Sequence, residues 1–316
     1  MIKSIKKSII IVMAVVLLFV LASCAIAENN PKPKSTPVQT TDDTEYPLTI
    51  TDTQGNKFKV EKEPEKIITI GPNLTETVYA LGKGDKLIGR TDYDDYPNQV
   101  SEVESIGDLM TPNVEKVIDL DADIVLVSGT VMPDYINQMR QNSVPVFVID
   151  DQSSFEGVYD TILMIGNILN ANSKASEIVE DMKGKVADVT NKVNDLEKPT
   201  VYYVVGYGEY GDYTATGDTF ISFLLEMAGG DNIAKNEQGW SYSKEALIEK
   251  DPELIICSDR WDTKQGFMST PGYEDLTAVK EGKVFELDEN IITRQGPRLA
   301  DGLLELAKIL HPEAFN

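Results

Sequence analysis

The sequence NVEKVIDLDADIVLVS at 113–128 recurs in related form as SKEALIEKDPELIICS at 243–258, 130 residues further along the chain. In each copy a helix N-cap residue, Asn113 or Ser243, stands two residues before a glutamate. A charged turn and an apolar run follow. Each copy therefore predicts a helix, a tight turn and a buried strand, which together build a parallel sheet covered on both faces.

Two further passages recur in the same order. GDKL at 84–87 is matched by GDNI at 230–233, and VFVID at 146–150 is matched by VFELD at 284–288. Three matches in one order indicate a duplicated unit, and the period is too long for a solenoid. The surrounding alternation of apolar runs and helical segments is typical of doubly wound sheets. The prediction is an α/β fold of two Rossmann-like lobes with central, mostly parallel sheets, which enclose a cleft.

The segment between the two lobes is strongly helical. Apolar residues recur at spacings of three and four from 155 to 169, and a second such stripe runs from 178 to 196. If the first of these helices bridges the lobes, the hinge is a stiff rod and closure on a ligand is small.

The first residues predict the location of the protein. Three lysines precede an apolar run at 9–21 that is too short for a comfortable membrane span. LASC at 21–24 resembles the lipobox of bacterial lipoproteins, in which the cysteine is diacylated and becomes the new N-terminus. The prediction is a signal peptide over 1–23 and lipidation at Cys24, which places the protein outside the cell membrane. An ordinary signal peptide with an incidental cysteine is the alternative.

The chain after Cys24 is rich in Asn, Pro, Lys, Thr and Asp and lacks apolar periodicity, so we expect a flexible linker. The predicted organisation is a lipoprotein signal peptide at 1–23, a linker at 24–45, an N-terminal α/β lobe at 46–152, a bridging helix at 153–172 and a C-terminal α/β lobe at 173–316.

Charge narrows the range of partners. The formal net charge is −23, and it is −26 without the first 23 residues, which hold three lysines and no acid. Such a surface repels nucleic acids and anionic lipid headgroups, so we expect membrane contact through the lipid anchor only. Cys257, the one other cysteine, lies in an apolar run and is predicted to be a small buried core residue rather than part of a disulfide.

Five motifs together resemble one family. They are NLTE at 73–76 leading to YALG at 79–82, DYDDYP at 92–97, NVE at 113–115, GGDN at 229–232 and GPR at 296–298. Over nearly all of 46–316 the chain resembles the helical-hinge class of substrate-binding proteins of ABC importers, which captures iron-siderophores, haem and cobalamin. The resemblance implies a monomeric receptor that binds a metal chelate between two lobes and delivers it to permease transmembrane subunits. A surface receptor or sensor without a transport partner is the alternative.

The resemblance also implies that one surface glutamate at a helix start in each lobe meets arginines of the importer. Glu115 and Glu245 fall at these positions. The alternative is that each acid only complements a helix dipole, an effect of about 0.3 to 1 kcal/mol. Their equivalence in the two halves favours permease docking, because a two-fold transporter needs one anion per lobe.

Ligand capture is expected from loops at the ends of strands, as is general for open α/β sheets. Aromatic rings suit a flat macrocycle or a catecholate, and arginines suit carboxylate or catecholate oxygens. For each aromatic the alternative is packing of a turn. Leu109 stands near the position at which cobalamin binders carry a tryptophan, so the chain departs from them there. The candidates are Asn73, Thr75, Tyr93, Tyr96, Leu109, Met110, Tyr207, Tyr210, Tyr213, Trp240, Arg260, Trp261 and Arg294.

Enzyme function finds little support in the sequence. The single histidine, His311, excludes a histidine-based triad and the common histidine metal sites, including a site for bare zinc or manganese. No Gly-rich phosphate loop with its lysine is present. We therefore expect no catalysis and no cofactor, with any metal arriving inside the transported chelate.

Overall fold

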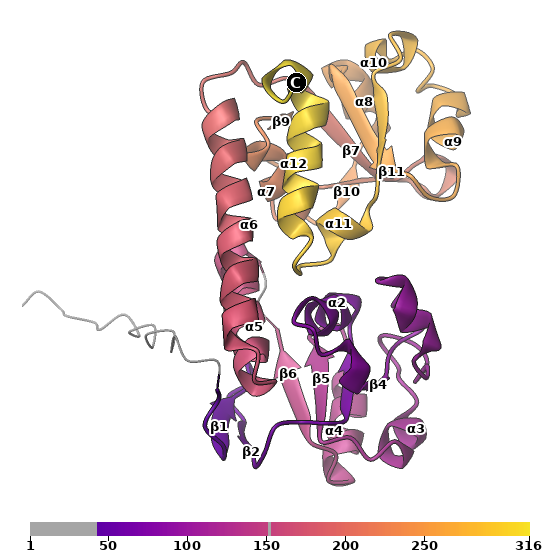
Figure 1. Ribbon diagram of the computed structural model, residues 1–316. Coiled ribbons are helices and arrows are strands. Elements are labelled where there is room, and N and C mark those ends of the chain that lie inside the picture. The colour runs from indigo at the N-terminus through magenta and orange to yellow at the C-terminus, as the bar shows by residue number, and fades with distance from the viewer. Residues whose placement is uncertain (1–42, 151–152) are drawn as a thin grey trace, which may run out of the picture. The chain divides into compact units, whose positions relative to one another are not determined.

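Two large sheets, of four and six strands, form the framework of the described residues, and a two-stranded hairpin forms a third, smaller sheet. The computed structural model describes residues 43–150 and 153–316. The first sheet has the order β4 (Leu87–Gly89), β3 (Ile67–Ile70), β5 (Ile124–Ser128), β6 (Val146–Ile149), and all its neighbours are parallel. The second has the order β10 (Ser241–Tyr242), β8 (Asp212–Thr214), β7 (Thr200–Gly206), β11 (Leu254–Ser258), β12 (Val284–Leu287), with β9 (Asp231–Asn232) also beside β7 (Figure 1). In this second sheet the pairs β7–β8 and β8–β10 are antiparallel, and the other pairs are parallel. The predicted fold class is confirmed.

The two sheets share a topology, as the repeated sequence predicts. In the first, β3 lies between β4 and β5, and β5 continues to β6. In the second, β7 lies between β9 and β11, and β11 continues to β12. The GDKL passage ends at the first residue of β4 and the GDNI passage contains β9, so the two passages fall at equivalent strands beside β3 and β7. The duplication is therefore visible in strand pairing as well as in sequence.

In both lobes an acidic residue at the equivalent position accepts hydrogen bonds from backbone N–H groups at the start of the central strand. Asp123 accepts hydrogen bonds from the backbone N–H groups of Glu65 and Lys66 at 2.8 and 3.0 Å, just before β3. Glu253 accepts from the N–H of Thr200 at 2.8 Å, at the start of β7. Each acid stands just before the neighbouring strand, β5 or β11, so it fixes the register of the central pair. This task explains why both copies of the repeat carry an acid there.

The helices are α2 (Pro72–Ala80), α3 (Val114–Asp119), α4 (Pro133–Gln141), α5 (Phe155–Ile168), α6 (Asn172–Val193), α7 (Phe220–Met227), α8 (Lys244–Lys250), α9 (Thr263–Ser269), α10 (Thr277–Lys280), α11 (Asn290–Thr293) and α12 (Leu299–Leu310). The predicted N-caps are confirmed, since Asn113 accepts from the Lys116 N–H and Ser243 from the Ala246 N–H, both at 3.1 Å.

Three apolar clusters fill the spaces between these layers. One lies between the first sheet and the pair α3 and α4, and another lies between the second sheet and the helices α8, α9 and α10. The third contains residues of β3, α2, α5, α6, α7, β7 and α12 without a break. Because helices cover both faces of each sheet, the central strands are buried throughout their length, as their unbroken apolar sequences require.

The connection between the lobes is a pair of helices rather than one. We expected residues 153–172 to form the bridge. Helix α5 reaches the second lobe through its first turn, where the rings of Phe155 and Phe220 lie 6.4 Å apart. The longer α6 packs against α5 and also against α12, so the lobe-to-lobe span belongs to α6 (Figure 1). The turn at residues 170–171 separates the two helices and lets α6 run back alongside α5. The domain limits given above remain a prediction.

The chain is already held in place where the predicted linker ends. The N–H of Thr44 donates to Asn170 at 2.7 Å, and its hydroxyl donates to the Asn167 carbonyl at 2.8 Å. The Tyr46 hydroxyl donates to the Ile168 carbonyl at 2.9 Å. The turn between α5 and α6 therefore fixes residues 44–46. The predicted signal peptide, Cys24 and the rest of the linker up to residue 42 lie outside the described residues.

The strands β1 (Leu48–Thr51) and β2 (Lys57–Val60) form an antiparallel hairpin. Asp52 closes the turn by accepting from the Asn56 N–H at 2.7 Å. The Thr53 N–H then donates to the Val148 carbonyl of β6 at 3.1 Å. The hairpin is a separate two-stranded sheet, and this contact places Thr53 beside the end of β6.

Cys257 is fully buried in β11, as predicted for a core residue, and burial raises the pKa of its thiol to about 11. Among the residues that the structure describes, none of the helices combines the length and the apolar character that a membrane crossing requires.

The contact between α5 and α6 generates a first prediction. A Cβ added at Gly166 of α5 would lie 2.4 Å from the Ala175 Cβ of α6, whereas a Cβ at the exposed Gly184 would meet nothing. Gly166→Ala should lower the free energy of unfolding by about 1–3 kcal/mol through overpacking. Gly184→Ala should raise it by about 0.5–1 kcal/mol through helix propensity. Urea denaturation of the two variants measures both, and equal effects would show that the helices are not closely packed.

Candidate functional site

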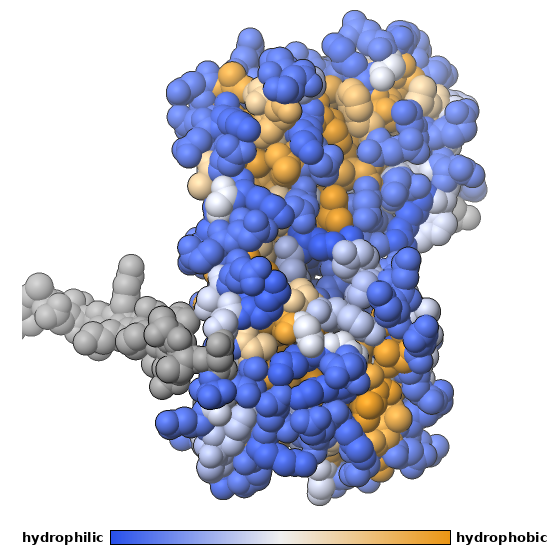
Figure 2. Space-filling view, in the orientation of Figure 1, coloured by the Kyte–Doolittle hydropathy of each residue, from blue (hydrophilic) through white to orange (hydrophobic). Residues whose placement is uncertain are grey.

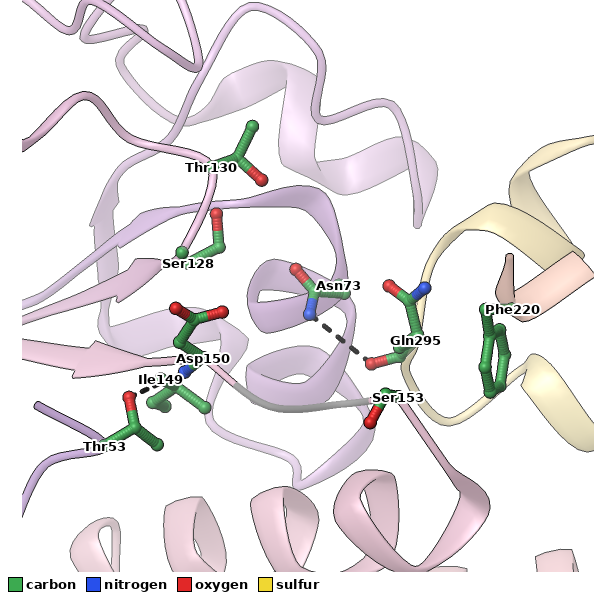
Figure 3. Close-up of a pocket in the computed structure, with 10 residues that line it drawn as sticks. Thr53, Asn73, Ser128, Thr130, Ile149, Asp150, Ser153, Phe220 and Gln295 are labelled. Carbon is green, nitrogen blue, oxygen red and sulfur yellow. Dashed lines mark hydrogen bonds between the residues drawn. The ribbon is translucent and has the colours of Figure 1, made fainter. Parts of the chain in front are cut away.

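A cavity of about 860 Å³ lies where strands of the first sheet end. This is within the usual size range of small-molecule sites, roughly 300–1,000 Å³. Residues that follow β3, β5 and β6 form one wall, and Phe220 of α7 and Gln295 come from the second lobe (Figure 3). The lining residues are Thr53, Asn73, Ser128, Gly129, Thr130, Ile149, Asp150, Ser153, Phe220 and Gln295.

Two glycines let the cavity wall form. Gly71 has a φ of 150°, and a Cβ there would lie 2.9 Å from the Ser128 Cβ, so only glycine allows β3 to turn into α2 beside β5. A Cβ at Gly129 would lie 2.2 Å from a carboxylate oxygen of Asp150. The Asp150 side chain therefore packs directly on the Gly129 backbone. The Asn73 amide reaches across to the second lobe and donates to the Gln295 carbonyl at 3.4 Å (Figure 3).

Beside the cavity, charged residues of both lobes form what we call the interlobe ion cluster: Glu76, Asp95, Arg260, Arg294 and Arg298. Glu76, on α2, accepts from Arg294 at 2.9 Å and from Arg298 at 2.8 and 2.7 Å. Asp95 accepts from Arg294 at 2.6 Å and from Arg260 at 3.1 Å. Both acids belong to the first lobe and all three arginines to the second.

The cluster has a buried half and an exposed half. The Glu76 side chain is 3% exposed and the Asp95 side chain 47%. Although burial works to raise the pKa of Asp95, hydrogen bonds from Arg294 and Arg260 lower it overall. A lowered pKa means that the stabilisation from Asp95 is present at neutral pH and is lost as the pH falls below about 3.9, the usual value for aspartate.

Several predicted ligand residues lie at this junction. Asn73 lines the cavity. The Tyr93 carbonyl accepts from Arg294 at 3.2 Å, and the Arg298 guanidinium lies 4.0 Å from the centre of the Tyr96 ring. Arg260 and Arg294 belong to the interlobe ion cluster. The exposed Tyr93, Tyr96 and Met110 side chains and the neighbouring Trp261 leave apolar surface available around it.

Other predicted ligand residues lie away from the cavity. Thr75 is fully buried, and its hydroxyl is 2.5 Å from that of Thr69. Leu109 packs against the apolar cluster beneath α3 and α4. Tyr207 packs on Phe267 and Tyr273 in the second lobe. These three side chains are turned into the lobe interiors because apolar or hydroxyl partners stand there.

Two candidates sit on the outer strands of the second sheet. The exposed Tyr213 belongs to β8, and Trp240 directly precedes β10, where its N–H donates to the Thr216 hydroxyl at 3.1 Å. The Tyr210 side chain lies outside what the structure describes.

The sequence reasoning missed most of the cavity wall. Ser128 is the last residue of β5 and Asp150 directly follows β6, so the strand-end rule could have found them. Glu76 lies inside the quoted NLTE motif, and Asp95 inside DYDDYP. Phe220 and Gln295 carried no comparable signal.

Glu115 and Glu245 are both exposed in the first turn of α3 and α8. The Ser243 hydroxyl donates to Glu245 at 3.0 Å. The backbone N–H of Glu245 and this hydroxyl lower the pKa of the Glu245 carboxyl. The two acids are thus accessible at equivalent positions.

No group of three or more His, Cys, Asp or Glu side chains that could hold a metal ion occurs among residues 43–150 and 153–316. His311 is buried, and its Nε2 lies 3.1 Å from the Gly229 carbonyl, so it is a structural residue of the second lobe.

Two duplicated α/β lobes, a helical connection and a cavity between them define a solute-binding protein. Residues 67–291 match the periplasmic binding protein family, and the chain belongs to that family. It is a substrate-binding protein of the helical-hinge class and not an enzyme.

Two relatives and one solved structure support this family assignment. The chain is 36% identical over 278 residues to an uncharacterized ABC transporter substrate-binding lipoprotein, YvrC, of Bacillus subtilis strain 168, covering 86% of this chain and 88% of that one. It is 29% identical over 279 residues to a cobalamin-binding protein of Halobacterium salinarum strain R1, covering 84% and 74%. The crystal structure of a possible iron-binding, periplasmic solute-binding protein from Staphylococcus epidermidis ATCC 12228 matches with a TM-score of 0.69 at 28% identity, covering 79% and 100%.

The asymmetry of the interlobe ion cluster generates a second prediction. Glu76→Gln removes the charge that faces two largely buried arginines and should lower the free energy of unfolding by about 3–5 kcal/mol. Asp95→Asn acts at the exposed half and should lower it by about 0–1 kcal/mol. Thermal and urea denaturation at pH 7 compare the two variants. A larger effect for Asp95→Asn would show that the exposed half holds the lobes together.

Proposed function

We propose that this protein is the lipid-anchored, extracytoplasmic receptor of an ABC importer and that it captures one metal chelate between its lobes for delivery to the permease. Ferric siderophores, haem and corrinoids are the candidate chelates. The names of two relatives support this assignment, one as an ABC transporter substrate-binding lipoprotein and the other as a cobalamin-binding protein.

The main support for the proposal is the backbone conformation and the exposure of the two tryptophans. Trp240 and Trp261 both have left-handed backbone conformations, with φ of 69° and 55°, and their side chains are 40% and 80% exposed. Bulky residues rarely adopt positive φ, and such strain gathers at ligand clamps. Folding alone gives no reason to strain the backbone in order to expose an indole ring.

The position of Trp261 adds to this argument. Its neighbour Arg260 contacts Asp95 of the first lobe, so Trp261 stands at the junction of the lobes. A large rigid ring offers apolar area to a macrocycle at low entropic cost. Together with the exposed Tyr93 and Tyr96, it forms an aromatic rim around the interlobe ion cluster.

Delivery to the permease rests on Glu115 and Glu245. Each side chain is exposed and stands in the first turn of a helix whose N-cap side chain accepts a hydrogen bond from a backbone N–H. Each also occupies the same place in its copy of the repeat. A transporter built from two equivalent membrane subunits can meet both through the same kind of basic contact. The hydrophilic character of the surface is seen in Figure 2, where polar residues cover most of the visible face.

Anchoring rests on Cys24 and the short apolar run before it. Two acyl chains suffice for stable membrane attachment, since each buried methylene contributes about 0.8 kcal/mol. The tether would join the folded part at residues 44–46, on the turn between α5 and α6.

Titration of tryptophan fluorescence tests ligand capture. The purified full-length protein in detergent should lose fluorescence on addition of one chelate from a panel of corrinoids, haem and ferric siderophores. Trp261→Ala should weaken its binding about 5- to 30-fold, as expected for the loss of 1–2 kcal/mol of ring contact. Ile118→Ala, an exposed apolar control on α3, should leave affinity unchanged. Binding of none of the panel by the wild-type protein would refute the proposal.

Charge reversal tests delivery. Cells whose only receptor carries Glu115→Lys and Glu245→Lys should lose chelate uptake, while the purified variant keeps wild-type affinity. Asp119→Lys with Glu249→Lys provides the matched control, because these exposed acids stand four residues further along the same two helices. Uptake that survives the first pair, or is lost equally with the second, would contradict docking through Glu115 and Glu245.

A further inference from the structure

The only charge on the described wall of the cavity is negative. Among the described residues that line it, Asp150 is the only ionisable side chain, and none is a lysine or arginine. The Asp150 side chain is exposed, and Figure 3 shows its carboxylate on the same wall as Ser128 and Thr130. A ligand in the cavity therefore meets a negative group with no cation beside it.

The arginines of the interlobe ion cluster do not balance the negative charge of Asp150. Arg294 and Arg298 are already held by Glu76, and Arg294 and Arg260 by Asp95. None of the three lines the cavity. Glu76 and Asp95 alone carry two negative charges against three positive ones, but Glu289 lies 3.7 Å from Arg260 and Asp288 lies 3.5 Å from Arg298. These four carboxylates together neutralise the positive side chains that an anionic ligand would need.

Asp150 is held in place from two sides. Its backbone N–H donates to the Thr53 hydroxyl at 2.9 Å, and that hydroxyl donates to the Val148 carbonyl at 3.1 Å. Its carboxylate packs against Gly129, where a Cβ would collide with it. The hairpin therefore fixes the backbone of Asp150, and its carboxylate lies beside the end of β5, where the absent side chain at residue 129 makes room for it.

The rest of the wall is made of neutral hydrogen-bonding groups. Ser128 is 9% exposed, and its Oγ has no hydrogen-bond partner among the described residues, although a buried hydroxyl normally has one. Thr130 and the Gln295 side chain also line the cavity, with a single ring from Phe220 (Figure 3). A carboxylate with hydroxyl and amide neighbours suits a partner that presents N–H or O–H donors.

We propose that Asp150 selects the charge of the transported chelate. The cavity accepts an uncharged or cationic chelate whose rim carries carboxamide or hydroxyl donors, and it rejects chelates that carry carboxylates. This inference rests on the proposed function, because it names the class of chelate that the receptor takes.

Electrostatics sets the direction of the selection. A ligand that fills the cavity displaces water from around the exposed Asp150 carboxylate, so a second carboxylate at close range is then repelled more strongly than in water, whereas a carboxamide N–H gains a charge-assisted hydrogen bond. Discrimination of this kind combines one attractive contact with one repulsive contact at the same atom.

A matched pair of ligands tests the proposal. Cyanocobalamin and its monocarboxylic acid derivatives differ by single carboxamide-to-carboxylate changes at the rim. The full-length wild-type protein should bind the carboxamide form about tenfold or more tightly than the carboxylate form carrying the charge nearest Asp150. Asp150→Asn should bring the two affinities within about threefold of each other. Asp134→Asn, at an exposed acid of α4 that does not line the cavity, should leave the ratio unchanged.

The outcomes separate this inference from the proposed function. Tighter binding of haem or of an anionic ferric siderophore than of any carboxamide-bearing corrinoid would overturn the role of Asp150 and leave the receptor function intact. An unchanged affinity ratio in a folded Asp150→Asn protein, checked by circular dichroism, would also overturn it. Failure of every chelate to bind would refute both.

Discussion

The position of Glu76 is the constraint on which the two-lobed arrangement depends. This carboxylate belongs to the first lobe and is almost completely buried, yet the charges that neutralise it come from Arg294 and Arg298 of the second. A buried carboxylate without a partner costs several kcal/mol, so the lobes must meet at this point. The apolar cluster through α5, α6 and α12 brings them together, and the ion cluster fixes which residues face each other.

The fold could be predicted from the sequence because its main features are local. Each copy of the repeat holds a cap, a helix and an apolar strand, and the acids Asp123 and Glu253 stand where the central strands need acceptors. Capping and burial of a strand depend on neighbouring residues, which a single sequence displays. The choice between α5 and α6 as the connecting helix depends on packing against α12, more than 100 residues further along, and the apolar stripe alone does not decide it.

The candidate site was harder to predict from the sequence, because it depends on contacts between residues that are far apart in the chain. Residues that end strands, such as Asn73, follow a general rule for open sheets, and the arginines were recognisable by charge. Their partners were not, because the contact of Arg294 with Glu76 joins residues 218 positions apart. The prediction treated Arg260 and Arg294 as available for ligand oxygens, whereas acids of the opposite lobe hold both. Selecting ligand residues by type alone therefore could not show that both arginines already have acidic partners.

Lobe association and ligand choice are consequently linked through one set of charges. The acids that draw the arginines across the junction also remove positive potential from the neighbouring cavity, where Asp150 then sets the sign. A receptor that used the same arginines for an anionic ligand would have to break contacts between its lobes each time the ligand bound. Keeping the arginines in the interlobe ion cluster avoids that cost, and it leaves the aromatic rim and the neutral wall of the cavity to recognise a ligand by shape and by hydrogen-bond donors.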